Sequence, residues 1–316
     1  MLKGSGAVLA LLCATQLTQG QQGPLNTPAG AANPDYVGSA VCRTCHPDVW
    51  LNFYKNPHYK SVASGREKPE NTGCESCHGP GKAHVEARGG QTSIIAFSQL
   101  APAQALETCL RCHAKDIPKA HIRRSAHTLA GIACNSCHSI HRSPTPKFLL
   151  ARAQADLCYG CHGDVRAQFN MPFKHRVNEG VVTCTDCHNP HGTPHPSWSM
   201  SARPRMVDQA LVNEQPCLKC HIDKRGPFLF EHPAVRIDGC EACHAPHGST
   251  NARLLKRPFT FTLCLECHHG LGNFGRQGDG VTQVSGSHNM ADPRFQNCTT
   301  CHVRIHGSNA DQRFLR

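Results

Sequence analysis

The sequence Cys-x-x-Cys-His occurs ten times in this chain of 316 residues, and the ten copies contain every cysteine except Cys13. Motifs 1 to 10 begin, in chain order, at Cys42, Cys74, Cys109, Cys134, Cys158, Cys184, Cys217, Cys240, Cys264 and Cys298. This is the pattern at which haem c is attached: two thiols form thioethers with one haem, and the adjacent histidine binds its iron. The sequence therefore predicts ten covalent haems.

The predicted cofactor-binding residues follow directly from the motifs. The cysteines are Cys42, Cys45, Cys74, Cys77, Cys109, Cys112, Cys134, Cys137, Cys158, Cys161, Cys184, Cys187, Cys217, Cys220, Cys240, Cys243, Cys264, Cys267, Cys298 and Cys301. The proximal iron ligands are His46, His78, His113, His138, His162, His188, His221, His244, His268 and His302.

Two other uses of Cys-x-x-Cys compete with haem attachment, namely zinc ribbons and disulfides. A zinc ribbon needs two cysteine pairs for one metal and no adjacent histidine. Disulfides between such close cysteines would close small loops that constrain little of the unfolded chain. Histidine is 23 of 316 residues, so its presence after all ten pairs is not a matter of composition. Haem attachment is the interpretation that explains the histidines.

The composition indicates a chain that folds around its cofactors. Aromatic residues make up 6% and hydrophobic residues 39% of the sequence, which is a thin basis for a conventional core. Haems would supply the missing apolar surface. The predicted fold is a multihaem cytochrome c, mainly short α-helices and long loops wrapped around a haem array, with little or no β-sheet. The motifs are compatible with an elongated array and with a compact one; the elongated form is what the repeat and the family resemblance described below imply.

Residues 1–20 are predicted to be an export signal. Lys3 precedes the apolar stretch Ala7 to Ala14, a polar run follows, and cleavage near Gly20 would remove Cys13. A lipoprotein anchor on Cys13 is the alternative. Residues 21–316 are then the decahaem domain, in the bacterial periplasm or beyond, where c-type haems are attached. No other segment has the roughly 18 apolar residues of a spanning helix.

The ten motifs fall into five pairs, which predict five two-haem modules over about 38–90, 100–145, 150–195, 210–250 and 258–310. In each pair one extra histidine lies between the motifs and another follows the second motif. These predicted distal ligands are His58 and His84, His127 and His141, His175 and His191, His232 and His247, and His288 and His306. Their assignment to individual haems stays open, because a neighbouring module can supply a ligand.

Ten distal candidates for ten haems predict histidine on both faces of every iron. Such an iron has no open coordination site, so it passes electrons instead of binding a substrate. Histidine ligation also favours a low reduction potential, and the few methionines after residue 20 are too few for general Met ligation. Outside the motifs and the ten candidates, His121, His195 and His269 remain.

From the opening Gly38-Ser39-x-x-Cys42, through the ten motifs, to the closing His302-x-x-x-His306-Gly, the chain resembles the decahaem cytochromes of the MtrA/DmsE type. The resemblance covers essentially residues 38–307. It implies a wire of bis-histidine haems inserted in an outer-membrane β-barrel porin. The implied partners are an extracellular multihaem cytochrome and a periplasmic or inner-membrane cytochrome that donates or accepts electrons.

Other functions remain as alternatives. A periplasmic electron carrier or store without a barrel would have the same haem chemistry, and a multihaem reductase would need an open haem that no motif indicates. The direction of electron flow, for extracellular respiration or ferrous iron oxidation, is set by partner potentials. The formal charge of +11 is offset by about twenty haem propionates, and nothing indicates nucleic-acid binding.

Overall fold

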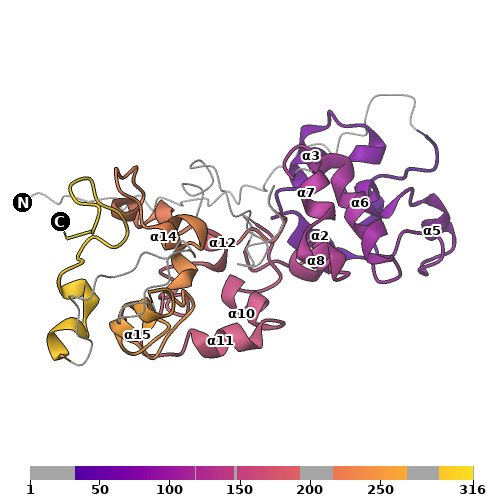
Figure 1. The fold of residues 1–316 in the computed structure, drawn as a ribbon. Helices are drawn as coiled ribbons and strands as arrows, with labels where there is room; N and C mark the ends of the chain where they lie inside the picture. The colour runs from indigo at the N-terminus through magenta and orange to yellow at the C-terminus, as the bar shows by residue number, and fades with distance from the viewer. Residues whose placement is uncertain (1–32, 118, 146–147, 193–215, 269–291, 316) are drawn as a thin grey trace, which may run out of the picture. The chain divides into compact units, whose positions relative to one another are not determined.

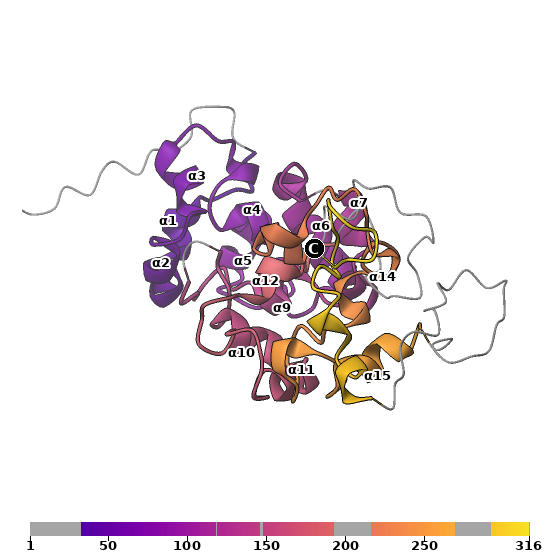
Figure 2. The same ribbon diagram turned by 60° about the vertical axis from the view of Figure 1, so that its left-hand side comes forward.

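The computed structural model describes residues 33–117, 119–145, 148–192, 216–268 and 292–315, which fall into two compact units. Unit 1 is Met1–Ala96 and unit 2 is Phe97–Arg316. The described parts of both consist of short helices joined by loops (Figures 1 and 2), with isolated β-bridges and no named strand. The predicted fold of short helices and loops, with little or no β-sheet, is confirmed. The predicted signal peptide lies outside the described residues.

Unit 1 is built around motifs 1 and 2. Its helices are α1 (Ser39–Cys42), α2 (Pro47–Phe53), α3 (Tyr59–Ser64), η1 (Pro69–Asn71), α4 (Glu75–His78) and α5 (Lys82–Glu86). Helix α2 has Pro47 at its first position, where the missing N–H costs no hydrogen bond. Helices α1 and α4 each contain part of a motif, so the cofactor-binding residues are themselves helical turns.

A buried carboxylate ties the segment before motif 1 to motif 2. Glu75 is 4% exposed and accepts hydrogen bonds from the backbone N–H groups of Val37, Gly38 and Gly81, at 2.9, 2.8 and 2.7 Å. The buried Ser39 hydroxyl also accepts a 2.9 Å hydrogen bond from the N–H of Cys74. A buried charge is tolerated when it is fully hydrogen-bonded, as this one is. These contacts set motif 1 against motif 2.

Unit 2 contains the other eight motifs. Its described helices are α6 (Pro102–His113), α7 (Lys119–Arg123), α8 (Ala126–Leu129), α9 (Cys134–Cys137), α10 (Gln154–Tyr159), α11 (Gly163–Gln168), α12 (Cys184–Cys187), η3 (Pro216–Lys219), η4 (Ile222–Lys224), α14 (Pro233–Ile237), η5 (Cys240–Ala242), η6 (Ala252–Leu254), α15 (Thr260–Leu265), η7 (Pro293–Phe295) and η8 (Cys298–Thr300). Helix α10, which includes Cys158 of motif 5, and helix α11, which follows His162 of that motif, lie side by side (Figures 1 and 2).

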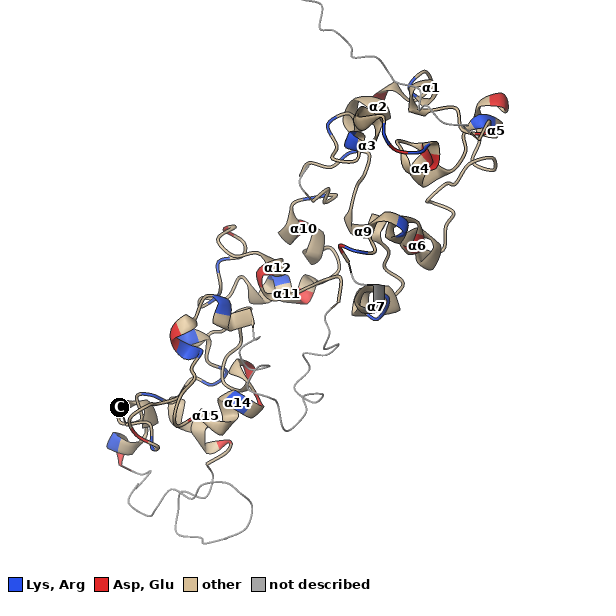
Figure 3. Ribbon diagram, turned by 90° about the horizontal axis from the view of Figure 1, so that it is seen from above, with Lys and Arg blue, Asp and Glu red and all other residues tan. Residues whose placement is uncertain are grey.

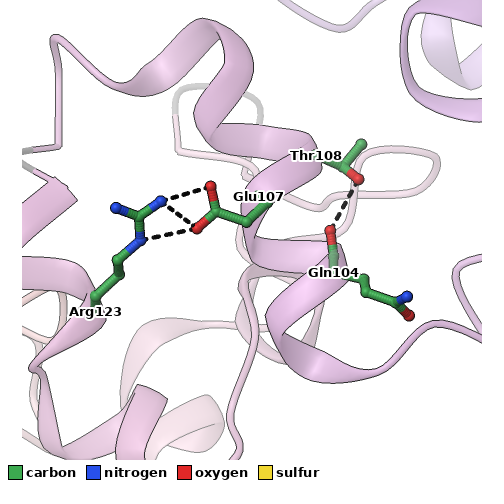
Figure 4. A network of polar contacts seen from close by, with 4 residues as sticks. All are labelled: Gln104, Glu107, Thr108 and Arg123. Atoms are coloured by element: carbon green, nitrogen blue, oxygen red, sulfur yellow. Dashed lines mark hydrogen bonds and ion pairs between the residues drawn. The ribbon is translucent and has the colours of Figure 1, made fainter.

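Helix α6, with 12 residues, is the longest of the described helices. Pro102 occupies its first position. The side chain of Gln104 accepts a hydrogen bond from the N–H of Ala101, the residue that precedes the helix, and this bond caps the helix N-terminus. Leu106 and Leu110 of α6 pack with Ile122 into a small buried cluster. Figure 4 shows the forked ion pair between Glu107 of α6 and Arg123 of α7, in which Arg123 Nη2 lies 2.7 Å from Glu107 Oε1. In the part of unit 2 that the structure describes, this apolar cluster anchors motif 3.

The described residues bury few apolar side chains and leave many exposed. The buried ones are Phe53, Ala105, Leu106, Leu110, Ile122, Ala133, Leu149, Phe169, Val177 and Leu218. The exposed large ones are Val41, Leu51, Tyr54, Val85, Leu129, Phe148, Phe173, Val181, Ile222, Leu229, Ile237, Phe259 and Val303. Such exposure is expected of a polypeptide whose apolar side chains pack on cofactors. None of the helices in the described ranges is long and apolar enough to cross a membrane.

We predict that Glu75→Gln destabilises the protein by about 1.5–3 kcal/mol, the worth of a hydrogen bond to a charged group. The substitution removes the negative charge and places the NH₂ group of the new amide against backbone N–H donors, which it cannot accept from. Guanidinium unfolding followed by the Soret band measures the change. Glu70→Gln, at an exposed position of η1, is the matched control and should change the stability by less than about 0.5 kcal/mol. Equal stability of the two variants would contradict this role of Glu75.

Candidate haem sites

Each motif folds as one turn of helix. In nine motifs the N–H of the histidine donates to the carbonyl oxygen of the first cysteine at 2.8–3.0 Å, and motif 3 is the last turn of α6. Positions i, i+3 and i+4 of a helical turn lie on one face. The fold thus directs both thiols and the imidazole of a motif to the same side. All twenty motif cysteines are free thiols at half-buried or exposed positions.

Seven motif histidines face a second histidine across a gap. The pairs are His46 with His84, His138 with His191, His162 with His127, His188 with His247, His221 with His175, His244 with His306, and His268 with His232. Every second histidine in these pairs is one of the ten distal candidates. The ring centroids are 5.9–6.3 Å apart.

This separation is the one that a metal ion bound by both rings requires. A metal–imidazole bond is about 2.0 Å long and the ligating nitrogen lies roughly 1.2 Å from its ring centre, so the two centroids should be about 6.4 Å apart. Direct stacking of aromatic rings covers a wider range, from about 4.5 to 7 Å. The seven centroid separations lie close together, near the distance that a shared metal ion would require, and therefore fit a haem iron between the rings.

Hydrogen bonds leave the correct ring nitrogen available for iron. Among motif histidines, the Nδ1–H groups of His78, His138, His244 and His302 donate to backbone carbonyls, and that of His113 donates to Asp116. Among distal histidines, His58, His84, His127, His175 and His247 donate in the same way to oxygen atoms. A proton on Nδ1 places the lone pair on Nε2. Such partners orient metal-bound histidines.

Four distal histidines are held neutral by their surroundings. Burial lowers the pKa of His191, His232 and His247 below the usual value. Burial, with a smaller effect from Lys224, lowers the pKa of His306 to about 4. Because only a neutral imidazole offers a lone pair to a metal, these four side chains are in the ligating form at neutral pH.

In unit 2 the second histidine of every pair comes from a neighbouring motif pair. The first motif of a pair receives its histidine from the preceding pair, as His162 of motif 5 does from His127. The second motif receives it from the following pair, as His138 of motif 4 does from His191. The other four pairs of unit 2 follow the same rule. In unit 1, His46 and His84 belong to one motif pair.

Backbone contacts hold these exchanged segments in place. Phe173, two residues before His175, forms a two-bond β-bridge with Ser249, which follows His247-Gly248 (3.1 and 2.8 Å). Phe230, two residues before His232, pairs with Ser308 in the same way, at 2.8 and 2.9 Å. The loops after His247 and His306 therefore dock on the segments that lead into the intermediate histidines of the previous pairs.

Neighbouring motifs also approach each other through their sulfur atoms. The first cysteines of the two motifs in each pair share a thiol hydrogen bond: Cys42 with Cys74, Cys109 with Cys134, Cys158 with Cys184, Cys217 with Cys240, and Cys264 with Cys298. The bond from Cys42 lowers the pKa of Cys74 to about 7, and the bond from Cys264 lowers the pKa of Cys298 to about 6.

Between successive pairs of unit 2 the second cysteine of one motif meets the next motif. Burial raises the pKa of Cys137, and repulsion from Cys161 raises it further. In the same way, Cys217 adds to the effect of burial on the pKa of Cys187, and Cys267 adds to it on the pKa of Cys243. Motifs 3 to 10 therefore follow one another in space in the order of the sequence. In the haem-loaded chain these sulfurs are thioethers, and their closeness means that neighbouring attachment sites adjoin.

Comparisons with known proteins agree with the motifs. The family model described as "Doubled CXXCH motif" matches residues 127–167 and 232–273, and the model described as "Cytochrome c554 and c-prime" matches residues 83–139. Multiheme cytochrome MtrA of Shewanella baltica (strain OS185) is 32% identical over 280 residues, which cover 86% of this chain and 79% of that protein. The chain belongs to the MtrA-type multihaem cytochromes. It is a c-type cytochrome that binds several haems and transfers electrons.

Two further relatives align with this MtrA-type chain. The high-molecular-weight cytochrome c of Nitratidesulfovibrio vulgaris is 22% identical over 89% of the chain, which spans 53% of that protein. The cytochrome c-type protein NrfB of Escherichia coli O6:H1 is 30% identical over 51% of the chain and 91% of its own length.

The doubled-motif matches agree with the ligand geometry. The first match begins at His127 and includes His162, and the second begins at His232 and includes His268. Each matched range therefore contains an intermediate histidine together with the motif histidine that it faces. These ranges are offset by one motif from the five predicted modules, whose boundaries stay a prediction.

The predicted site residues are otherwise placed as follows. His58, His78, His113, His141 and His302 lie in described segments outside the seven pairs, and His288 lies outside the described residues. His121 is described as part of α7 and belongs to none of the seven pairs. His195 and His269 lie outside the described residues.

Sequence reasoning missed the residues that support the distal ligands. The glycine after a trailing histidine is one class: a Cβ on Gly192, Gly248 or Gly307 would overlap His121, Gln168 or Phe228 of the segment against which it packs. The second class of supporting residues is the proline before a trailing histidine: the carbonyls of Pro190 and Pro246 accept hydrogen bonds from His127 and His175. The repeated phrase Pro-His-Gly, present at 190–192 and 246–248, is the signal that could have identified both classes.

We predict that Gly248→Ala opens the haem site of motif 6. The added Cβ overlaps the Gln168 carbonyl, so His247 must withdraw from His188. The ferric protein should gain a high-spin signal equal to one haem in its electron paramagnetic resonance spectrum. Gly163→Ala is the control, because a Cβ there meets no atom within 4 Å. A low-spin Gly248→Ala protein indistinguishable from the control would disprove the close-contact argument.

Proposed function

We propose that the chain carries ten haem c groups, each held by the two cysteines and the histidine of one motif and by a second histidine. The observation that supports this most strongly is the set of seven histidine pairs with a nearly constant ring separation. Three motif histidines, His78, His113 and His302, and three candidates, His58, His141 and His288, are then left for the other three haems. Motif and distal histidines are therefore equal in number.

In this proposal the chain conducts electrons and catalyses no reaction on a small substrate. A haem supplies one-electron redox chemistry at its iron. The two paired imidazoles would hold the iron from both sides, so no position would remain for a substrate. The Nδ1 hydrogen bonds fix the ring orientation, and two histidine ligands favour a low reduction potential.

The order of the attachment sites supports conduction along the chain. Motifs 3 to 10 of unit 2 adjoin one another in sequence order through their sulfur atoms. Electron tunnelling falls steeply with distance, so adjoining sites favour transfer between neighbours over transfer that skips a site. The motif order is therefore proposed as the order of electron transfer, and an elongated array is its simplest form.

We further propose that the mature chain works in the periplasm, inserted in an outer-membrane β-barrel porin. Its relationship to MtrA supports this location. The loops that join its helices could not contact lipid directly, because their backbone groups would lack hydrogen-bond partners, whereas a barrel offers a polar interior. The proposed partners are the porin, an extracellular multihaem cytochrome, and a periplasmic or inner-membrane cytochrome.

The basic side chains are proposed to offset the charge of the cofactors. Figure 3 shows Lys and Arg spread along helices and loops of both units, with Asp and Glu among them. The chain has 33 Lys and Arg against 22 Asp and Glu. Because ten haems add about twenty propionates, this excess is available for their neutralisation.

We predict that His191→Ala converts the haem of motif 4 into a site open to external ligands. His138 would keep the iron on one face, while the other face loses its ligand. The reduced protein should bind carbon monoxide with a stoichiometry of one haem per chain, measured from the Soret difference spectrum. The control variant His121→Ala lacks a histidine that belongs to none of the seven pairs, so this variant should bind no carbon monoxide. Carbon monoxide binding by the unmodified protein to a similar extent would contradict closed sites.

The conduit role predicts recovery of the chain from solubilised outer membranes together with a β-barrel of equal stoichiometry. Electron transfer to an acceptor enclosed in proteoliposomes should require both proteins. Recovery of all haem-replete protein in the osmotic-shock fluid, with no barrel bound, would instead favour a free periplasmic carrier.

A further inference from the structure

The seven histidine pairs fall into two classes by the angle between their ring planes. In four pairs the planes are nearly parallel, at 11–16°: those of motifs 1, 4, 8 and 9. In the pairs of motifs 5, 6 and 7 the planes cross at 69°, 50° and 68°. The three crossed pairs are consecutive in the motif order, so they form one central segment of unit 2.

The distal rings of the crossed pairs share a structural feature. In each of them the Nδ1–H of the distal ring donates to an oxygen from a segment 63 to 79 residues away: His127 to the Pro190 carbonyl at 3.2 Å, His175 to the Pro246 carbonyl at 2.6 Å, and His247 to the Gln168 side chain at 3.1 Å. Among the parallel pairs, the distal His84 donates to the Gly90 carbonyl six residues away, whereas the distal His232 is hydrogen-bonded to the backbone of Ile305. A distant acceptor is therefore common to the three crossed rings, but its distance along the chain alone does not decide the ring angle.

His247 is the case in which a side chain sets the ring. Its Nδ1–H donates to Oε1 of Gln168, the last residue of α11. The buried Phe169 packs on the same ring at 5.2 Å between centroids. The Gln168 backbone also packs closely on Gly248, the next residue after His247. The end of α11 thus determines both the position and the rotation of this ligand.

The ring angle has an electronic consequence for an iron bound by both rings. Two iron d orbitals can interact with the imidazole rings. Parallel rings both interact with the same one of these orbitals and so separate the two in energy. Crossed rings interact with one orbital each and leave the two nearly equal in energy. The two arrangements give low-spin ferric haems with different magnetic anisotropy, and they alter the reduction potential, which axial ligands control.

We infer that motifs 5, 6 and 7 form an electronically distinct central segment of crossed-imidazole haems, and that Gln168 is the positioning residue that crosses His247 over His188. This inference rests on the proposed bis-histidine ligation. It means that unit 2 does not present eight equivalent sites: electrons that follow the motif order pass through three sites of one class between sites of the other.

Electron paramagnetic resonance of the fully ferric protein tests the inference. We expect a strongly anisotropic low-spin signal, typical of crossed rings, from at least three haems, beside the rhombic signal of parallel rings. A spectrum with the rhombic low-spin signal alone would overturn the two classes. High-spin haem in place of these signals would instead show that the proposed ligation has failed.

Gln168→Met tests the positioning residue, because methionine has a similar length but cannot accept the hydrogen bond. The expected result is loss of one haem's share of the anisotropic signal, with the total low-spin intensity unchanged. Gln168→Glu, which keeps an acceptor, should restore that share. Gln154→Met is the matched control, since the Gln154 side chain bonds Thr185 and no histidine. An unchanged spectrum in Gln168→Met would overturn the role of Gln168.

Discussion

The structure depends on one repeated interaction: two histidine rings face each other at the separation that a shared metal ion would require. In unit 2 these rings come from different motif pairs, so each proposed haem joins two segments that have little other apolar contact. The described core is a small cluster around Leu106 and Leu110. In the proposed haem-loaded protein, metal–ligand bonds would replace a conventional core as the main connection between segments, in the way that metal binding supplies folding free energy in small metalloproteins.

The supporting contacts make sense as consequences of this exchange. A ring that must reach a neighbouring segment needs close backbone approach, which the glycines after His191, His247 and His306 allow. It also needs a fixed orientation, which acceptors such as Pro246 provide. The pair in unit 1 departs from the rule: His46 faces His84 of its own motif pair. Glu75 then fixes motif 1 by another means, through three backbone amides.

Much of this could be predicted from the sequence, because the chemistry is local in it. The spacing Cys-x-x-Cys-His places three donors on one helical face, and the histidines repeated at equivalent positions include all seven second rings that face a motif histidine. The fold class followed from the scarcity of aromatic residues. The pairing could not be predicted, since exchange between neighbours leaves no trace in the spacing. Nor could the role of Glu75 or Gln168, because the first occupies a variable motif position and the second an ordinary helix end.

The account is tested most directly by near-infrared magnetic circular dichroism of the fully ferric protein, with the haem content per chain determined in parallel. The charge-transfer band position distinguishes bis-histidine from histidine–methionine and high-spin haem. The account predicts bis-histidine bands alone, with an intensity equal to ten haems. A high-spin or histidine–methionine band of one haem or more in the intact protein would contradict it.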